Sequence, residues 1–128
     1  MRLTHVSLFS GIGGIDLAAE ISGFSTKVQV EINPYCRKIL SMRFPNAKQF
    51  TDIRDVTGDD IFNETNGESP TVMSGGFPCQ PISKAGNRLG SKDERWLWPE
   101  YHRLIRETKP RWILAENVER LTNIPEFK

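Results

Sequence analysis

The chain has 128 residues and a mass of 14.6 kDa, which fits one modest domain with a core of its own. A formal net charge of +1 and a pI near 7.8 exclude a globally basic protein, so any nucleic-acid binding has to rest on local patches. No apolar run approaches the roughly 20 residues that span a bilayer, and the chain begins directly with a strand, so we expect a soluble, cytoplasmic protein without a membrane partner.

The first predicted unit is a buried strand over 6–9 that runs into a glycine turn and a helix over 10–20. Glycines in such a turn let the backbone approach a ligand, and the N–H groups of the helix start face a polar or anionic group. The order Gly-x-Gly-Gly differs from the dinucleotide pattern, which favours a ligand without a pyrophosphate, such as S-adenosylmethionine. A glycine-rich turn alone is weak evidence for a ligand. The candidate cofactor-binding residues in this unit are Phe9, Ser10, Gly11, Gly13 and Gly14.

A second strand, predicted over 27–31, ends with Glu31, roughly 20 residues after the glycines. An acid at this point of an open α/β fold accepts hydrogen bonds from ribose hydroxyls, although a solvated glutamate at a strand end is an equally good interpretation. Asn33 predicts the N-cap of a helix over 35–44, and the spacing of its apolar residues assigns Cys36 to the core.

A weaker strand over 47–50 leads to Asp52 and Ile53. This pair suits an adenine, because the carboxylate accepts from the exocyclic amine while the isoleucine packs on the ring. Taken alone, an acid in this position is more often a helix cap. A short polar helix over 57–66 follows, to which we assign no function.

A strand over 71–73 precedes the stretch 74–81, Ser-Gly-Gly-Phe-Pro-Cys-Gln-Pro, which sets Cys79 between two prolines. The glycines allow backbone conformations closed to other residues, and the prolines fix φ, so the loop is stiff. A free cysteine is usually a small buried hydrophobe. This loop has no hydrophobic periodicity and cannot continue a strand or start an ordinary helix, so we predict that Cys79 is a nucleophile. The two cysteines show no disulfide framework or metal-ligand spacing, so we predict no metal site.

The segment 82–95 is basic and contains scattered glycines. Its cations could meet phosphates as part of a lid, or the segment could be a plain charged loop. The candidate nucleic-acid contacts are Gln80, Ser83, Lys84, Arg88 and Arg95.

The last predicted elements are a helix over 96–108 and a fully buried parallel strand over 111–115, which delivers Glu116 and Asn117 at its end. Strands that alternate with helices predict a doubly wound, mostly parallel α/β sheet. The candidate residues all follow strands, and the carboxyl ends of the strands form the edge at which such sheets bind ligands. We therefore expect one site.

Several motifs occur in an order that resembles the cytosine-C5 DNA methyltransferases along nearly the whole chain. They are Phe9-Ser10-Gly11-Ile12-Gly13-Gly14, Glu31, Asp52-Ile53, Pro78-Cys79-Gln80 and Glu116-Asn117-Val118. The resemblance implies a Rossmann-like, S-adenosylmethionine-dependent fold in which Cys79 adds to C6 of a flipped cytosine, Glu116 acts at N3 and Asn117 helps to hold the base. It also implies that Ile32, Pro78 and Leu97 join the cofactor site.

The resemblance leaves the substrate open, because duplex DNA is expected for most of the family and a tRNA cytosine for one branch. A non-catalytic cofactor-binding or DNA-binding module is a further alternative. Ser7 stands where many members carry an acid, and Ile32 stands where some carry an aromatic residue. The family continues with further strands, an arginine-bearing motif, a target recognition domain and a terminal segment. We therefore expect residues 1–128 to be a partial catalytic domain, truncated after the fifth strand and inactive alone or completed by a second polypeptide.

Overall fold

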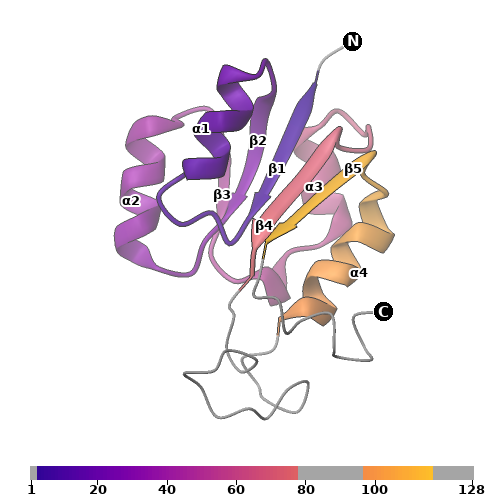
Figure 1. Cartoon of the computed structure of the whole chain (residues 1–128). Coiled ribbons are helices and arrows are strands. Elements are labelled where there is room, and N and C mark those ends of the chain that lie inside the picture. Colours follow the sequence, from indigo (N-terminus) through magenta and orange to yellow (C-terminus); the bar gives the residue numbers. More distant parts are fainter. Residues whose placement is uncertain (1–2, 78–96, 117–128) are drawn as a thin grey trace.

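The computed structural model describes residues 3–77 and 97–116 (Figure 1). Within these ranges the elements are β1 (Thr4–Leu8), α1 (Gly14–Ile21), β2 (Ser25–Val30), α2 (Pro34–Arg43), β3 (Lys48–Phe50), the 3₁₀ helix η1 (Ile53–Asp55), α3 (Gly58–Glu64), β4 (Val72–Gly76), α4 (Trp98–Thr108) and β5 (Trp112–Glu116). In the same ranges, no helix is long and apolar enough to cross a bilayer.

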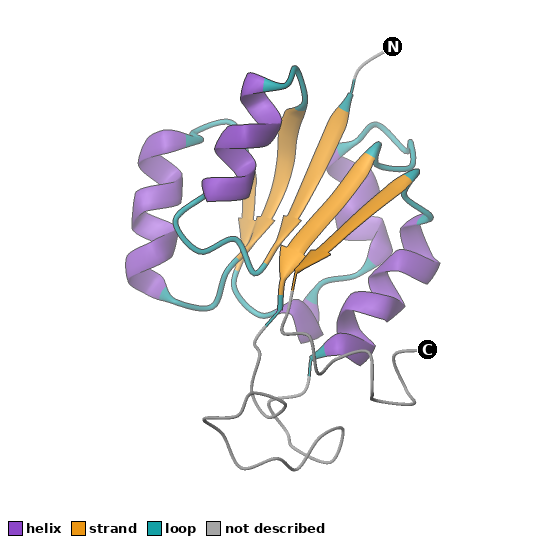
Figure 2. Ribbon diagram, in the orientation of Figure 1, coloured by secondary structure: helices purple, strands orange, loops and turns teal. Residues whose placement is uncertain are grey.

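All the strands pair in parallel, in the order β3-β2-β1-β4-β5. The chain moves outward from β1 to β3, returns to β4 beside β1, and then moves outward again to β5. The connections from β1 to β3 run one way across the sheet, and those from β3 to β5 run the other way. Right-handed crossovers therefore put α1 and α2 on one face of the sheet and α3 and α4 on the other, as Figures 1 and 2 show. This arrangement confirms the predicted doubly wound α/β sheet.

The apolar core lies between the sheet and the pair α3 and α4. Alternate residues of β1 and β2 point to this face and are buried. The buried core residues include Val6, Leu8, Val28, Val30, Met73, Ile61, Tyr101 and Leu104. Burial of these side chains fixes the register of the sheet, and thereby the positions at which its carboxyl ends meet.

The opposite face of the sheet, beneath α1, is polar. The buried polar side chains there are His5, Ser7, Thr26, Gln29 and Ser74 of the strands, together with Asp16 of α1. The His5 ring is fully buried, with Nδ1 2.8 Å from Thr26 Oγ1 and Nε2 2.6 Å from Ser74 Oγ. Burial lowers the pKa of His5 from its ordinary value, although the nearby Asp16 carboxylate opposes the shift. The folded protein therefore holds this imidazole neutral.

The lowered pKa of His5 predicts a loss of stability in mild acid. The unfolded chain takes up the proton below about pH 6.5, whereas the folded chain resists it, so the free energy of unfolding should fall as the pH drops through this value. The slope should be at most about 1.4 kcal/mol per pH unit. Urea denaturation between about pH 5 and 7.5 measures it, and His5→Gln should flatten the profile. An equal slope in both proteins would contradict the assignment.

The strand β5 differs from its prediction as a fully buried strand. It is the edge strand, and Trp112, Ile113 and Leu114 are 70%, 46% and 53% exposed. On one face α4 packs against it, and the Tyr101 hydroxyl donates to the Leu114 carbonyl at 3.0 Å. Strand periodicity predicts an apolar surface but cannot tell whether a neighbour covers it.

Two further predictions need correction. The strand β4 continues through Gly75 and Gly76, whereas the sequence predicts that both belong to the cysteine loop. Neither glycine has a positive φ. Cys36 is half-buried rather than part of the core, although the predicted Asn33 cap is confirmed, since its side chain accepts from the backbone N–H groups of Tyr35 and Cys36.

Candidate functional site

The glycine turn after β1 contains three residues in the left-handed region. Phe9, Gly11 and Gly13 have φ angles of 52°, 59° and 92°. A Cβ added to Gly13 would lie 2.5 Å from Cε2 of Phe44, so position 13 needs glycine for space as well as for conformation. Tight packing against Phe44 thus sets the path of the turn.

A buried chain of polar side chains anchors this turn. The Ser7 hydroxyl donates to Asp16 Oδ1 at 2.7 Å and lies 2.8 Å from Ser10 Oγ, while Gln29 Nε2 donates to Asp16 Oδ2 at 2.7 Å. Asp16 is fully buried in the first turn of α1. It therefore brings an acid next to Ser7, the position at which the sequence departs from the family pattern. Sequence reasoning missed Asp16, whose place in the first turn of an amphipathic helix was the available signal.

Glu31 follows β2, and its side chain binds the glycine turn. Its Oε1 accepts from the backbone N–H of Gly11 at 2.7 Å, and its Oε2 accepts from the backbone N–H of Asn33 at 2.9 Å. Each carboxylate oxygen keeps a further lone pair. The two contacts therefore fix the carboxylate at the carboxyl edge of the sheet and leave it able to accept from a ligand.

Asp52 caps η1, as the more conservative interpretation of the sequence held. Its Oδ1 accepts from both the backbone N–H and the Nε of Arg54, each at 3.0 Å. The side-chain hydrogen bond from Arg54 holds the pKa of Asp52 below its ordinary value, so this carboxyl is ionised at neutral pH. Both contacts use Oδ1, and no hydrogen bond from the described residues engages Oδ2.

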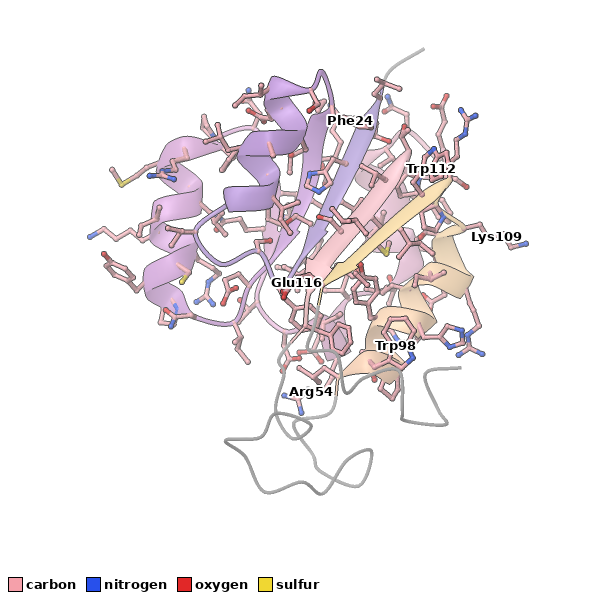
Figure 3. The ribbon with its side chains drawn as sticks, viewed as in Figure 1. Phe24, Arg54, Trp98, Lys109, Trp112 and Glu116 are labelled. Carbon is pink, nitrogen blue, oxygen red and sulfur yellow. The ribbon has the colours of Figure 1, made fainter. Side chains whose placement is uncertain are left out.

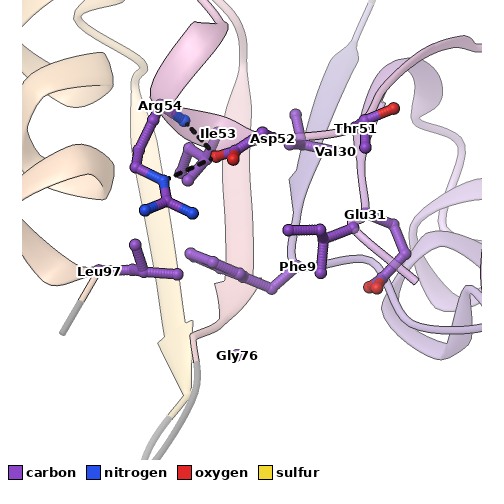
Figure 4. A pocket seen from close by; sticks show the side chains of 10 residues that line it. Phe9, Val30, Glu31, Thr51, Asp52, Ile53, Arg54, Gly76 and Leu97 are labelled. Carbon is purple, nitrogen blue, oxygen red and sulfur yellow. Dashed lines mark hydrogen bonds and ion pairs between the residues drawn. The ribbon is translucent and has the colours of Figure 1, made fainter. Parts of the chain in front are cut away.

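These ends of β1, β2 and β3 surround a cavity of about 240 Å³ (Figure 4). It is lined by Phe9, Val30, Glu31, Ile32, Thr51, Asp52, Ile53, Arg54, Gly76 and Leu97. Six of these are predicted cofactor-binding residues, whereas Ser10, Gly11 and Gly13 belong to the adjoining turn and Gly14 begins α1. Val30, Thr51 and Arg54 are not among the predicted residues, because no motif marks them, and Gly76 is predicted as part of the cysteine loop rather than of the cofactor site.

Glu116 ends β5 at the same edge of the sheet, where Figure 3 shows it on the side of Arg54 and Trp98, opposite to Trp112. It pairs in register with Gly76. A Cβ built on Gly76 would lie 2.6 Å from Glu116 Oε2. The glycine therefore leaves room for the observed position of this carboxylate, which a larger residue would displace.

The end of β4 is held by an aromatic cluster. Phe77 is buried, and its ring centroid lies 5.5 Å from that of Trp98, 6.0 Å from that of Tyr101 and 6.4 Å from that of Phe9. Such contacts stabilise aromatic pairs by about 0.5–1.5 kcal/mol each. Phe77, which belongs to the predicted nucleophile loop two residues before Cys79 in the sequence, is therefore firmly held by its neighbours.

Several predicted residues lie outside the described part of the chain. They are Pro78, Cys79, Gln80, Ser83, Lys84, Arg88, Arg95 and Asn117. Among residues 3–77 and 97–116, no group of histidine, cysteine and acidic side chains could hold a metal ion.

The sequence of this chain was compared with family models and with known proteins. The family model for C-5 cytosine-specific DNA methylases matches residues 3–126. The Type II methyltransferase M.NgoMIV of Neisseria gonorrhoeae is 37% identical and aligns with 100% of this chain and 39% of its own length. M.AquIA of Picosynechococcus sp. is 38% identical, over 96% of this chain and 51% of its own. The chain thus spans between about two fifths and a half of the length of these relatives.

The fold comparison agrees. A crystal structure described as a prophage-encoded DNA modification methyltransferase of E. coli superposes with a TM-score of 0.77 and 32% identity. The match covers 91% of this chain and 32% of that one. Because the family model matches almost the whole sequence and the sheet has the same architecture, this chain belongs to the C-5 cytosine-specific DNA methylase family.

Proposed function

We propose that this chain is the cofactor-binding and nucleophile-bearing segment of a DNA (cytosine-5-)-methyltransferase. In this proposal a methyl group passes from S-adenosylmethionine to C5 of a cytosine that has left the duplex. The observation that carries it is the cavity at the carboxyl edge, where Glu31 and Asp52 face an apolar wall beside the end of β4. Such an edge is the binding site of open α/β sheets.

The donor set of the cavity fits the cofactor. The Glu31 carboxylate would accept from the ribose hydroxyls, and Asp52 Oδ2 would accept from the adenine amine. Phe9, Ile53 and Leu97 supply apolar surface for the ring. When bound, the cofactor supplies an electrophilic methyl group on its sulfonium. At about 240 Å³ the cavity is smaller than the roughly 300–1,000 Å³ of complete small-molecule sites, so it suits the nucleoside part.

The chemistry is assigned to Cys79 and Glu116. The thiolate of Cys79 would add to C6 of the cytosine, forming a C–S bond and pushing electrons into the ring, so that C5 becomes nucleophilic. Glu116 would protonate or hydrogen-bond N3 as this electron density develops, and Asn117 would help to hold the base. After methylation, loss of the C5 proton to a base restores the C5–C6 double bond and expels the thiolate.

Duplex DNA is the proposed substrate, because the relatives that match are named Type II methyltransferases. Cations of the segment 82–95, with Lys84, Arg88 and Arg95, would contact phosphates, while Gln80 and Ser83 lie in the sequence beside the nucleophile. If the active enzyme methylated tRNA and not duplex DNA, the substrate would instead be a tRNA cytosine, as expected for one branch of the family.

We further propose that the remainder of the catalytic domain, in the same or a second polypeptide, covers the face of β4 and β5 beside α1. A groove of about 210 Å³ lies there, lined by residues that include Ile15, Ala18, Phe24, Val72 and Leu114. Together with the exposed surface of β5, this groove presents an apolar area of the kind that soluble domains cover.

The cofactor assignment predicts that Glu31→Ala weakens the binding of S-adenosylhomocysteine about tenfold to a hundredfold, because hydrogen bonds to a charged group are lost. Titration calorimetry on the 128-residue chain measures the effect, and we expect weak binding by the wild type. Glu20→Ala, on the exposed surface of α1, is the control and should bind as the wild type does. Equal affinities for wild type and Glu31→Ala would remove Glu31 from the site.

A further inference from the structure

We infer that Arg103 of α4 is a positioning residue for the purine end of the cofactor site. It does not line the cavity. It binds backbone carbonyls of the η1 turn and thereby keeps Asp52 and Ile53 in a fixed arrangement toward an adenine ring. The inference deepens the proposed function and rests on it.

The contacts of Arg103 with η1 bracket the turn. Its Nη2 donates to the carbonyl of Ile53 at 3.0 Å and to the carbonyl of Val56 at 2.8 Å. Ile53 is the first residue of η1, and Val56 is its C-cap. One guanidinium nitrogen therefore ties together both ends of the turn that carries the cavity residues Ile53 and Arg54 and that Asp52 caps.

The same guanidinium is held firmly on its own helix. Its Nε donates to Glu100 Oε2 at 2.8 Å, and its Nη1 donates to Glu107 Oε2 at 3.0 Å. Desolvation disfavours the charge, yet these two carboxylates raise the pKa of Arg103 above its ordinary value. Glu107 also accepts from the backbone N–H of Gly58 at 2.7 Å, which is the main cause of its lowered pKa. The hydrogen bonds of Arg103 and Glu107 thus join α4 to η1 and to the start of α3.

The turn depends on such external support. η1 has three residues and few backbone hydrogen bonds of its own, from Asp55 to Asp52 at 3.0 Å and from Val56 to Ile53 at 3.2 Å. A 3₁₀ turn of this length has little independent stability. The helix behind it is rigid by comparison, because Tyr101 and Leu104 are fully buried.

The consequence concerns recognition of the base. Arg54 holds Oδ1 of Asp52, and Arg103 holds the turn on which both depend, so Oδ2 keeps one position relative to Phe9 and Leu97. An adenine amine donates to this oxygen, whereas the O6 of hypoxanthine would face it with another acceptor. Arg103 therefore acts on selectivity for adenine through the turn. Lysine cannot substitute, because an ammonium lacks the planar fork that reaches carbonyls and carboxylates together.

The test is an NMR titration of the full chain with S-adenosylhomocysteine and with its deaminated form, S-inosylhomocysteine. The wild type should prefer the adenine form by about tenfold or more, because the inosine form loses a charge-assisted hydrogen bond. In Arg103→Ala and Arg103→Lys the preference should fall below about threefold, and the Ile53 methyl signal should shift less on binding. Should the alanine variant fail to fold, the lysine variant carries the test.

Two control variants separate positioning from plain stability. Arg106→Ala removes an exposed guanidinium from the same helix. Ile105→Ala weakens the packing of α4 against the core but leaves the hydrogen bonds from Arg103 to η1 in place. Both should keep the wild-type preference, although Ile105→Ala should melt at a lower temperature. An unchanged preference in the Arg103 variants, or an equal loss in Ile105→Ala, would overturn the inference and leave the proposed function intact. A wild type that binds both ligands equally would likewise overturn the inference alone, because the site would then not select adenine. A wild type that binds neither ligand would overturn the proposed function and this inference with it.

Discussion

Methyl transfer should be abolished when Cys79 is replaced by serine in an active assembly, in which the rest of the catalytic domain is supplied in cis or in trans. We expect turnover to fall by roughly four orders of magnitude or more, as for other enzymes that lose their nucleophile. A thiol supplies a few per cent of thiolate at neutral pH, whereas a serine hydroxyl stays protonated and is far less nucleophilic. Transfer of labelled methyl groups to duplex DNA measures the change.

Cys36→Ser is the matched control for this experiment. Cys36 lies half-buried in the first turn of α2, and its backbone N–H donates to the Asn33 side chain at 3.3 Å. A serine at this position keeps the same backbone contact, so turnover should stay within about twofold of the wild type. Substantial transfer by Cys79→Ser, or its loss in Cys36→Ser, would show that the nucleophile is wrongly assigned.

Gly76→Ala should lower turnover in the same assembly about a hundredfold and leave most of the fold stability unchanged. The added methyl group would meet Oε2 of Glu116 at 2.6 Å, so this carboxylate must swing away from the edge of the sheet. Loss of one group that stabilises charge in a transition state typically costs about 10²–10³ in rate. The flexible end of a side chain gives way more easily than the backbone does, so folding should survive.

Gly75→Ala provides the contrast. Its Cβ would lie 2.8 Å from the backbone carbonyl oxygen of Leu8, which cannot move without disturbing β1, so we expect a loss of stability. The single variant Glu116→Gln and the double variant Glu116→Gln/Gly76→Ala should have about equal turnover. Each of the two substitutions removes the Glu116 carboxylate from its position, so the second adds little to the first. Full activity of Gly76→Ala would mean that the observed position of Glu116 is not the catalytic one. Urea denaturation distinguishes the two glycine variants.

The parts of this protein that the sequence could predict depend on local pattern. Short apolar runs alternate with segments of helical periodicity, and this alternation predicts the parallel sheet. Because Glu31, Asp52 and Glu116 each follow a predicted strand, they were expected at one edge of that sheet. The resemblance to the methyltransferases rested on the order of these motifs, and the family match confirms it. Helix caps such as Asn33 were predictable, because capping involves only neighbouring residues.

The parts that the sequence could not predict depend on contacts between distant residues. Arg103 is one of several charged residues on α4, and its spacing from Glu100 and Glu107 is typical of a solvated helix face. Only the packing of α4 beside η1 gives it backbone carbonyls to bind. The glycine at position 76 likewise reflects a neighbour, Glu116, on the adjacent strand. The composition of β5 predicts a buried strand, and the exposure of Trp112 and Ile113 could be expected only from the resemblance to a family whose fold continues with further strands.

Mapping of a covalent DNA adduct tests the central claim most directly. A duplex with 5-fluorocytosine at the target site should trap the active assembly in the presence of cofactor, because fluorine cannot leave C5 as a proton does and the C–S bond persists. Peptide mass spectrometry should then find the modified base on Cys79, and Cys79→Ser should give no adduct while Cys36→Ser still does. An adduct on Cys36, or one that survives Cys79→Ser, would contradict the nucleophile and the mechanism built on it.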